Sequence, residues 1–192
     1  MSDIVTLKQI LDESMLIPIQ EKQEGTHTKY FVILGESQDD YAVTVKEMPK
    51  PDEVIVINVD KFRIPAHIFN GDKGECKRAD YVIIANTDSE KVILCIELKK
   101  GEKPTNWIIQ QLTGAKCFIL YCQILVKHFW HKWDFLDEYE YRFVTFKKIP
   151  IDKKITRYQT NQQRSSATEI HNSPEKMLKI SSLNSLRFGQ LI

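Results

Sequence analysis

Two carboxylates and a lysine lie at the ends of neighbouring apolar segments, in the order Asp80, Glu97 and Lys99. The segments read YVIIA from position 81 and VILCIELK from position 92, a composition typical of buried strands. A charged side chain seldom enters such a segment without a partner, because burying an unpaired charge is costly. Strand side chains alternate between faces, so Glu97 and Lys99 should point the same way. Two carboxylates beside an amine would suit a hard divalent cation and acid–base chemistry.

The connection between the two segments supports this convergence. Residues 86–91 read NTDSEK, a polar stretch flanked by apolar residues, which predicts a hairpin or a slightly longer loop. A hairpin would place Asp80, at the start of the first strand, opposite Glu97 and Lys99, at the end of the second. An ordinary surface salt bridge on a sheet face is the alternative explanation of the same residues.

An Asp, a hairpin and then Glu-x-Lys resembles the core motif of the PD-(D/E)XK nuclease superfamily. The resemblance covers about residues 66–126, and the chain departs from the family pattern at Ala79, where the family name has proline. It implies an α/β fold with a restriction-endonuclease-like core, in which helices flank a mixed central β-sheet. Several branches of the family carry a Gln on the helix after the Glu-x-Lys strand, and Gln111 or Gln110 matches it here.

The resemblance implies a metal-dependent nuclease that hydrolyses DNA phosphodiester bonds, with Mg²⁺ or Mn²⁺ as its cofactor. The implied metal ligands are Asp80, Glu97 and the main-chain carbonyl of Leu98, with one or two ions left open. Lys99 is expected to orient or deprotonate the attacking water, or to neutralise developing charge. Gln111 is the implied partner that positions the water or the lysine.

Small members of this family often serve in prokaryotic restriction, repair or antiviral defence, so the resemblance implies such a role on double-stranded DNA. A non-catalytic protein of the same fold, acting as a binding or scaffold module, is the second hypothesis. The complete set of Asp80, Glu97 and Lys99 favours the enzyme. Cutting both strands commonly uses two sites, so we expect a homodimer.

Charge marks one segment as a candidate nucleic-acid surface. The whole chain is nearly neutral, with 27 Lys and Arg against 26 Asp and Glu, but residues 142–164 carry seven basic residues and one acidic residue. A basic strand that continues into a basic loop could follow a phosphate backbone, and a solvated loop explains the composition equally well. The expected nucleic-acid contacts lie in this segment and just before Asp80: Lys147, Lys148, Lys153, Lys154, Lys77 and Arg78.

The aromatic and imidazole side chains near the middle of the chain carry less weight. His128 and His131 lack a carboxylate at ligand spacing, so we expect packed or solvated histidines. Trp107, Trp130 and Trp133 are expected in the core or at an interface, in preference to stacking on bases.

Periodicity predicts the elements that position the site. Ser2 should cap an N-terminal helix, and apolar runs at 30–34, 41–45 and 54–59 predict an N-terminal β meander that extends the catalytic sheet. A long helix should begin at Pro104-Thr105. Its apolar positions recur every three or four residues and define one buried face: Ile108, Leu112, Ala115, Ile119, Cys122 and Val126.

The end of the chain completes this plan. Residues 141–146 predict a strand beside the Glu97 strand, residues 152–175 a long loop, and residues 177–192 a return to the core as a short strand or hairpin. With 192 residues, of which 42% are hydrophobic, we expect one domain. Its parts are an N-terminal helix and strands over 1–65, a catalytic core over about 66–150, and the basic loop with its return over 151–192.

Several kinds of protein are disfavoured by the sequence. No early stretch has the pattern of a secretory signal, and no uninterrupted apolar run is long enough to span a bilayer. The four cysteines show no C-x-x-C spacing, which disfavours a disulfide framework and a zinc cluster. We therefore expect a reduced, cytoplasmic protein that has no membrane partner.

Overall fold

The computed structural model describes residues 2–35, 41–62, 68–99, 101, 103–147, 170–181 and 185–192. This part of the chain contains two α-helices and two mixed sheets, which makes it an α/β protein. The helices are α1 (Asp3–Ile10) and α2 (Thr105–Phe129). The central sheet contains β4 (Val54–Asn58), β5 (Tyr81–Asn86), β6 (Lys91–Lys99), β7 (Glu140–Lys147) and β8 (Leu178–Ser181). The second sheet contains β1 (Gln20–Glu24), β2 (His27–Leu34), β3 (Val43–Lys46) and β9 (Ser185–Arg187).

The central sheet keeps its five strands in sequence order. Neighbours are antiparallel from β4 to β6, and parallel from β6 through β7 to β8. The hairpin between β5 and β6 is therefore confirmed, as is the strand predicted beside the Glu97 strand. Every residue of β4 is buried, as expected for a strand covered on both faces.

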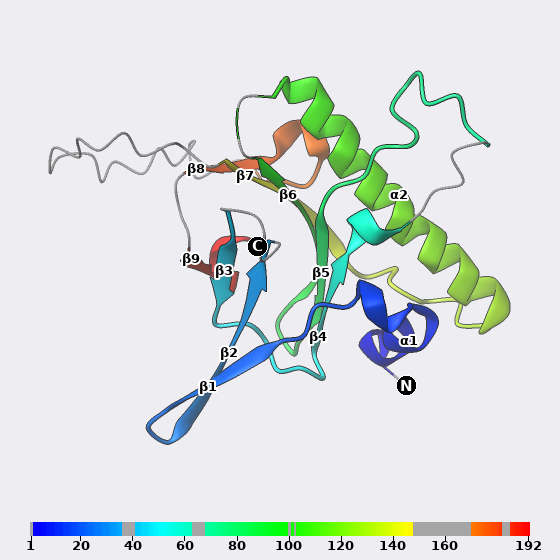
Figure 1. The fold of residues 1–192 in the computed structure, drawn as a ribbon. Helices are drawn as coiled ribbons and strands as arrows, with labels where there is room; N and C mark the ends of the chain where they lie inside the picture. The colour runs from blue at the N-terminus through cyan, green and yellow to red at the C-terminus, as the bar shows by residue number, and fades with distance from the viewer. Residues whose placement is uncertain are drawn as a thin grey trace, which may run out of the picture.

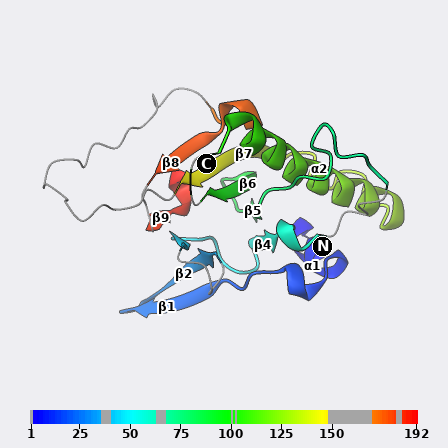
Figure 2. The ribbon, with the colours of Figure 1, turned by 45° about the horizontal axis from the view of Figure 1, so that its top comes forward.

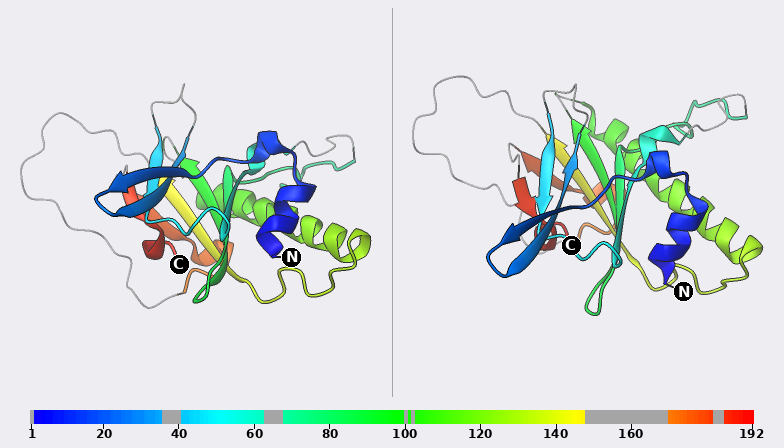
Figure 3. Two further views of the ribbon diagram at one scale, coloured as in Figure 1. Left: turned by 90° about the horizontal axis from the view of Figure 1, so that it is seen from below. Right: turned by 60° about the horizontal axis from the view of Figure 1, so that its bottom comes forward.

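The molecule has three layers, with the central sheet in the middle (Figures 1, 2 and 3). Helices α1 and α2 cover one face, where Leu7 and Leu112 pack against Val82 and Ile93 in one apolar core. The second sheet covers the other face and forms a second core with it. Alternate residues of β4, β5, β6 and β7 therefore enter different cores.

Two expectations about the sheets need correction. Within the described ranges, the α-helices cover one face of the central sheet and the second sheet covers the other, because the runs at 30–34 and 41–45 belong to β2 and β3 of the second sheet. Only the run at 54–58 joins the central sheet, as its edge strand β4. The physical reason is that Val32, Leu34, Val43 and Val45 present one buried face, which covers the central sheet instead of extending its edge.

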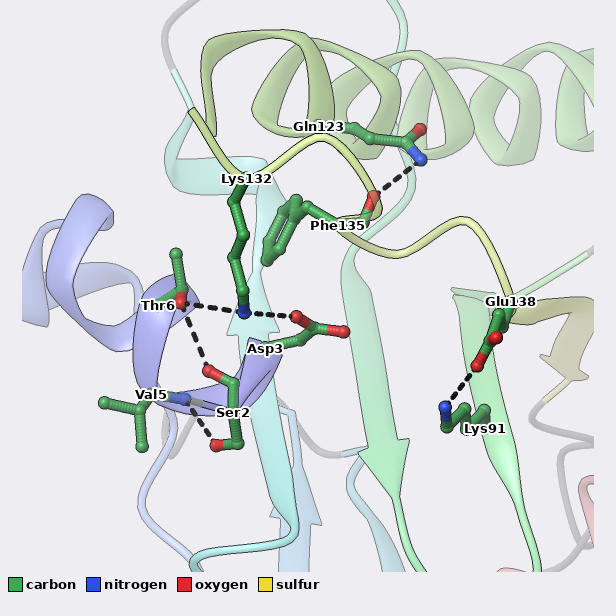
Figure 4. Close-up of polar contacts among 9 residues, drawn as sticks. All are labelled: Ser2, Asp3, Val5, Thr6, Lys91, Gln123, Lys132, Phe135 and Glu138. Atoms are coloured by element: carbon green, nitrogen blue, oxygen red, sulfur yellow. Dashed lines mark hydrogen bonds and ion pairs between the residues drawn. The ribbon is translucent and has the colours of Figure 1, made fainter. Parts of the chain in front are cut away.

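The predicted N-terminal helix is confirmed, and contacts anchor it near the end of α2. Ser2 caps α1 by accepting a hydrogen bond from the N–H of Val5 over 3.3 Å. The ammonium of Lys132 lies 2.6 Å from a carboxylate oxygen of Asp3 (Figure 4). Gln123 donates to the carbonyl of Phe135 over 2.9 Å (Figure 4). The Lys132–Asp3 contact holds the connection from α2 to β7 against α1, and the Gln123–Phe135 hydrogen bond holds it against α2.

Helix α2 follows the sequence prediction closely. All six predicted apolar positions are buried, together with Phe118. By length and composition alone, α2 is also the one helix in the described ranges that is long and apolar enough to cross a membrane. Its buried face packs on the central sheet.

The C-terminal segment returns to the core as predicted, although it does not form a hairpin. Strand β8 lies parallel to β7 in the central sheet, and β9 lies parallel to β3 in the second sheet. Most of the predicted loop over 152–175 falls outside the described residues.

Candidate active site

Asp80 lies directly before β5 and opposite the end of β6. The β5–β6 ladder pairs Tyr81 with Ile96, so the next position of the ladder brings Asp80 opposite Glu97. The main-chain N–H of Leu98 donates a hydrogen bond to Oδ2 of Asp80 over 2.7 Å. This contact fixes the half-buried Asp80 carboxylate at the end of β6.

Strand alternation places both carboxylates on the helix-covered face of the central sheet. Val82 shares the face of Asp80, and Cys95 shares the face of Glu97, because strand side chains repeat every two residues. Both Val82 and Cys95 belong to the core beneath α2. Asp80 and Glu97 therefore face the same layer, as the hairpin prediction requires.

Glu97 and Lys99 form a buried ion pair. Glu97 is 1% exposed and Lys99 is 7% exposed, and the Lys99 ammonium contacts Oε1 of Glu97. Burial is the main cause that raises the pKa of Glu97 to about 8; the nearby charge of Asp80 acts in the same direction, and Lys99 opposes both effects. Because the pair is inside the protein, the surface salt bridge does not explain it.

The second oxygen of Glu97 has no hydrogen-bond partner in the part of the chain that the structure describes. Oε2 is buried and makes no hydrogen bond within the described residues. The N–H of Leu98 points toward Asp80. In a β-strand the carbonyl of a residue points to the same edge as its N–H, so the Leu98 carbonyl also points to the Asp80 side of β6. One carboxylate oxygen and one main-chain carbonyl are thus available beside Asp80.

Helix α2 brings Gln111 to the segment that leads into Asp80. Gln111 Nε2 donates to the carbonyl of Arg78 over 3.4 Å, and its Oε1 is buried without a hydrogen-bond partner in the described structure. Gln110, the alternative match, instead accepts a hydrogen bond from Lys77 over 2.6 Å and donates to the carbonyl of Lys73. Gln110 therefore fixes the preceding segment, and Gln111 has the uncommitted oxygen.

Gly114 allows α2 to approach this segment closely. A Cβ at position 114 would lie only 1.8 Å from the carbonyl oxygen of Lys77. A side chain at this position would push the helix away from residues 77 and 78. The glycine thus determines how near Gln111, one turn earlier, comes to the Asp80 segment.

Thr145 is a candidate site residue that sequence reasoning missed. It lies on β7 in register with Glu97, is 4% exposed, and its buried Oγ1 makes no hydrogen bond within the described residues. Glu97, Gln111 and Thr145 each have a buried side-chain oxygen that makes no hydrogen bond within the described ranges. Buried polar atoms are rarely left unpaired, so these oxygens indicate a place for water, an ion or substrate.

Trp107 lies beside the ion pair, half-buried against the core, as predicted for a core residue. Trp130 and Trp133 are 50% and 62% exposed, so they are not core residues. The rings of His128 and His131 both contact Trp133. These histidines are packed against an aromatic ring, in agreement with the sequence prediction.

The residues expected to bind nucleic acid divide into separate groups. Arg78 donates two hydrogen bonds to the carbonyl of Asp60, over 3.0 and 3.3 Å, which commits its guanidinium to the fold. Lys147 is half-buried and in register with Lys99 on the site face. Lys77 lies beside Trp107. The remaining three, Lys148, Lys153 and Lys154, fall outside the described residues.

The donor set fits a hard cation better than a soft one. No group of three or more His, Cys, Asp or Glu side chains that could hold a metal occurs among the described residues. Two carboxylates and a carbonyl match Mg²⁺, which keeps several waters and binds through one or two carboxylates. Zinc prefers nitrogen and sulfur ligands, and all four cysteines, each in a described range, are free thiols.

Comparison with known proteins adds no assignment. No family model matches the chain, and no curated protein or solved structure matches it. The site is therefore defined by its own geometry: two carboxylates, a lysine and a glutamine between the central sheet and α2.

Proposed function

We propose that this protein is a metal-dependent nuclease with a PD-(D/E)XK, restriction-endonuclease-like core, which hydrolyses DNA phosphodiester bonds. The observation that carries the proposal is the convergence of Asp80, Glu97 and Lys99 on one face of a hairpin, with a buried and unpaired oxygen on Glu97. The element order also supports it. Three antiparallel strands, a helix and a strand parallel to the third strand come in the order β4–β6, α2 and β7, and β1–β3 separate them from the N-terminal helix α1.

In this proposal the carboxylates of Asp80 and Glu97 and the carbonyl of Leu98 hold Mg²⁺ or Mn²⁺. A bound cation would polarise the phosphate and lower the pKa of a coordinated water. Glu97 suits this role because its carboxylate is buried next to a second carboxylate, an arrangement that a divalent cation would stabilise.

The other side chains would act on water and phosphate. The ammonium of Lys99 is held by Glu97 and the Trp107 ring, so it would donate hydrogen bonds to a phosphate oxygen or to the attacking water. Oε1 of Gln111 would accept a hydrogen bond from that water, and its anchored Nε2 limits where the oxygen can lie. Thr145 would offer a hydroxyl beside Glu97.

Double-stranded DNA, a homodimer and a role in prokaryotic restriction, repair or defence in the cytoplasm are parts of the same proposal. They rest on the family resemblance. Sedimentation with and without a short duplex would test the dimer.

The direct test is cleavage of supercoiled plasmid by the purified protein in Mg²⁺. Asp80→Asn and Lys99→Gln should each slow cleavage by about 100-fold or more, because each removes a group that stabilises charge at the reacting phosphate. Asp52→Asn is the matched control, since Asp52 is an exposed carboxylate far from the site in sequence. Equal cleavage by wild type and both site variants would reject the assigned roles. DNA binding without cleavage would favour a binding or scaffold module.

A further inference from the structure

Three lysine ammonium groups surround the ring of Trp107. The Nζ atoms of Lys99, Lys77 and Lys103 lie 3.8, 5.4 and 5.5 Å from the ring centroid. Each distance is within the range of a cation–π contact, about 6 Å. The lysines come from three different parts of the chain: β6, the segment before Asp80, and the approach to α2.

The positive charge of this cluster is only partly balanced. Lys99 pairs with Glu97, and Lys77 donates to the neutral amide of Gln110. Among the described residues, Lys99 is the member of the cluster with a carboxylate partner. Like charges gathered at one ring repel each other, and a single aromatic face offsets this weakly. An anion beside the ring would remove the repulsion.

The fold holds two of these lysines, Lys77 and Lys99, in place without an anion. Gln110 binds both Lys77 and the carbonyl of Lys73, so the segment before Asp80 is fixed to α2. Gly74, at φ +91°, permits this packing, because a Cβ there would lie 2.9 Å from Gln110 Cδ. The position of Lys77 is therefore fixed by several contacts between the segment before Asp80 and α2.

We propose that Lys77, Lys103 and Trp107 bind a DNA phosphate next to the one that is cleaved, with Trp107 as the residue that positions Lys99. This inference rests on the proposed nuclease function. Lys99 joins the two places, because its ammonium contacts both Glu97 of the carboxylate site and the Trp107 ring. The cleaved phosphate would bind at the carboxylates, and the strand would continue over the ring toward Lys77 and Lys103.

The test for Lys77 and Lys103 is DNA affinity measured against salt concentration. A labelled duplex would be titrated with the full chain in Ca²⁺, and binding followed by fluorescence anisotropy. The double variant Lys77→Gln/Lys103→Gln should lower the log–log salt slope by about 1.8, since each phosphate contact contributes about 0.9. At 0.15 M salt this corresponds to roughly a fivefold loss of affinity per contact.

The matched control removes two lysines from the β1–β2 hairpin. Lys22 and Lys29 are exposed, and the β1–β2 hairpin that carries them lies well away from the start of α2 (Figure 1). The double variant Lys22→Gln/Lys29→Gln should bind the duplex with the wild-type salt slope. If Lys77→Gln/Lys103→Gln also keeps that slope, or if the wild type binds no DNA, the inference is wrong.

Kinetics test the role of Trp107. Trp107→Leu removes the ring and should lower kcat by about tenfold or more, because a misplaced Lys99 no longer meets the reacting phosphate. Trp107→Phe keeps a ring and should recover most of kcat, which a loss of packing alone would not predict. An equal loss of kcat in both variants, with wild-type stability, would contradict the positioning role.

The two proposals can fail separately. If DNA binding depends on Lys77 and Lys103 but the wild type cleaves nothing in Mg²⁺, the phosphate site is supported and the nuclease function is rejected. If the wild type cleaves DNA and the double variant binds DNA like wild type, the nuclease function is supported and the phosphate site is rejected.

Discussion

The main-chain N–H of Leu98 donates a hydrogen bond to the carboxylate of Asp80 over 2.7 Å, although 18 positions separate the two residues in sequence. This bond links the start of β5 to the end of β6 at the place where the hairpin ladder stops. As a result, the Asp80 carboxylate is fixed beside Glu97 by the backbone of the sheet. The candidate metal ligands are held by a rigid element, as a preorganised site requires.

Glu97 predicts how stability depends on pH in excess chelator. Its folded-state pKa of about 8 exceeds the ordinary value of 4.5, so the folded protein keeps a proton that the unfolded chain releases between these values. The free energy of unfolding should therefore fall as pH rises from 4.5 to 8, by at most about 1.4 kcal/mol per pH unit from this group. Denaturant titrations across this range would measure it.

The Glu97→Gln variant isolates this contribution, because the other titrating groups cancel in the comparison with wild type. It should lack the decline and be more stable than wild type near pH 8. Glu90→Gln, which replaces an exposed glutamate next to the loop of the same hairpin, is the matched control for the loss of one carboxylate. Mg²⁺ should bind more tightly as pH rises, because the cation needs the ionised carboxylate. Identical pH profiles for wild type and Glu97→Gln would contradict the raised pKa of the buried Glu97.

Gly114→Ala tests the close approach of α2. The new methyl group would meet the Lys77 carbonyl at 1.8 Å, so the helix and the segment must separate. Overpacking of this kind costs about 1–3 kcal/mol, and cleavage should fall as Gln111 moves away from the site. Gly189→Ala is the control, since a Cβ there has no neighbour within 4 Å and the residue is remote in sequence. Chemical denaturation and plasmid cleavage give both readouts, and wild-type behaviour of Gly114→Ala in each would refute the approach.

Thr145→Val separates stability from function. Valine keeps the shape of threonine and removes the buried hydroxyl that has no partner in the described residues. Removing such a group should raise the free energy of unfolding by about 1 kcal/mol in the metal-free protein. Cleavage should nevertheless slow, if the hydroxyl contacts water or substrate beside Glu97. A variant that is both more stable and fully active would show that Thr145 lies outside the site.

Much of the central layer could be predicted from sequence, because its signals are local. The polar turn at 86–91 and the apolar runs around it specify the β5–β6 hairpin, and the spacing of apolar residues specifies α2. The Asp80, Glu97 and Lys99 positions follow from that hairpin and from strand alternation alone.

The second sheet could not be predicted in the same way. All five residues of β1 are exposed, so this strand has no alternation of polar and apolar residues to reveal it. Strand β9 spans only Ser185–Arg187 and pairs with a strand more than a hundred residues earlier. The sequences of β2 and β3 predict strands, but they do not show whether these strands extend the central sheet or pack on its face.

The remaining site features depend on contacts between distant segments. A threonine in a strand is ordinary, and only the register with Glu97 makes Thr145 notable. The sequence predicts Arg78 as a phosphate contact, yet in the structure its guanidinium donates a hydrogen bond to the carbonyl of Asp60. The lysines around Trp107 meet only after α2 folds onto the sheet.

The central claim is that a divalent cation at Asp80 and Glu97 drives phosphodiester cleavage. The measurement is plasmid cleavage by chelator-treated protein, with each cation returned singly. Mg²⁺ and Mn²⁺ should restore cleavage, and Ca²⁺ should support little turnover because its longer, looser coordination misplaces the attacking water. Zinc should not be required. Cleavage that persists in excess chelator, and is equal in Asp80→Asn, would contradict the account.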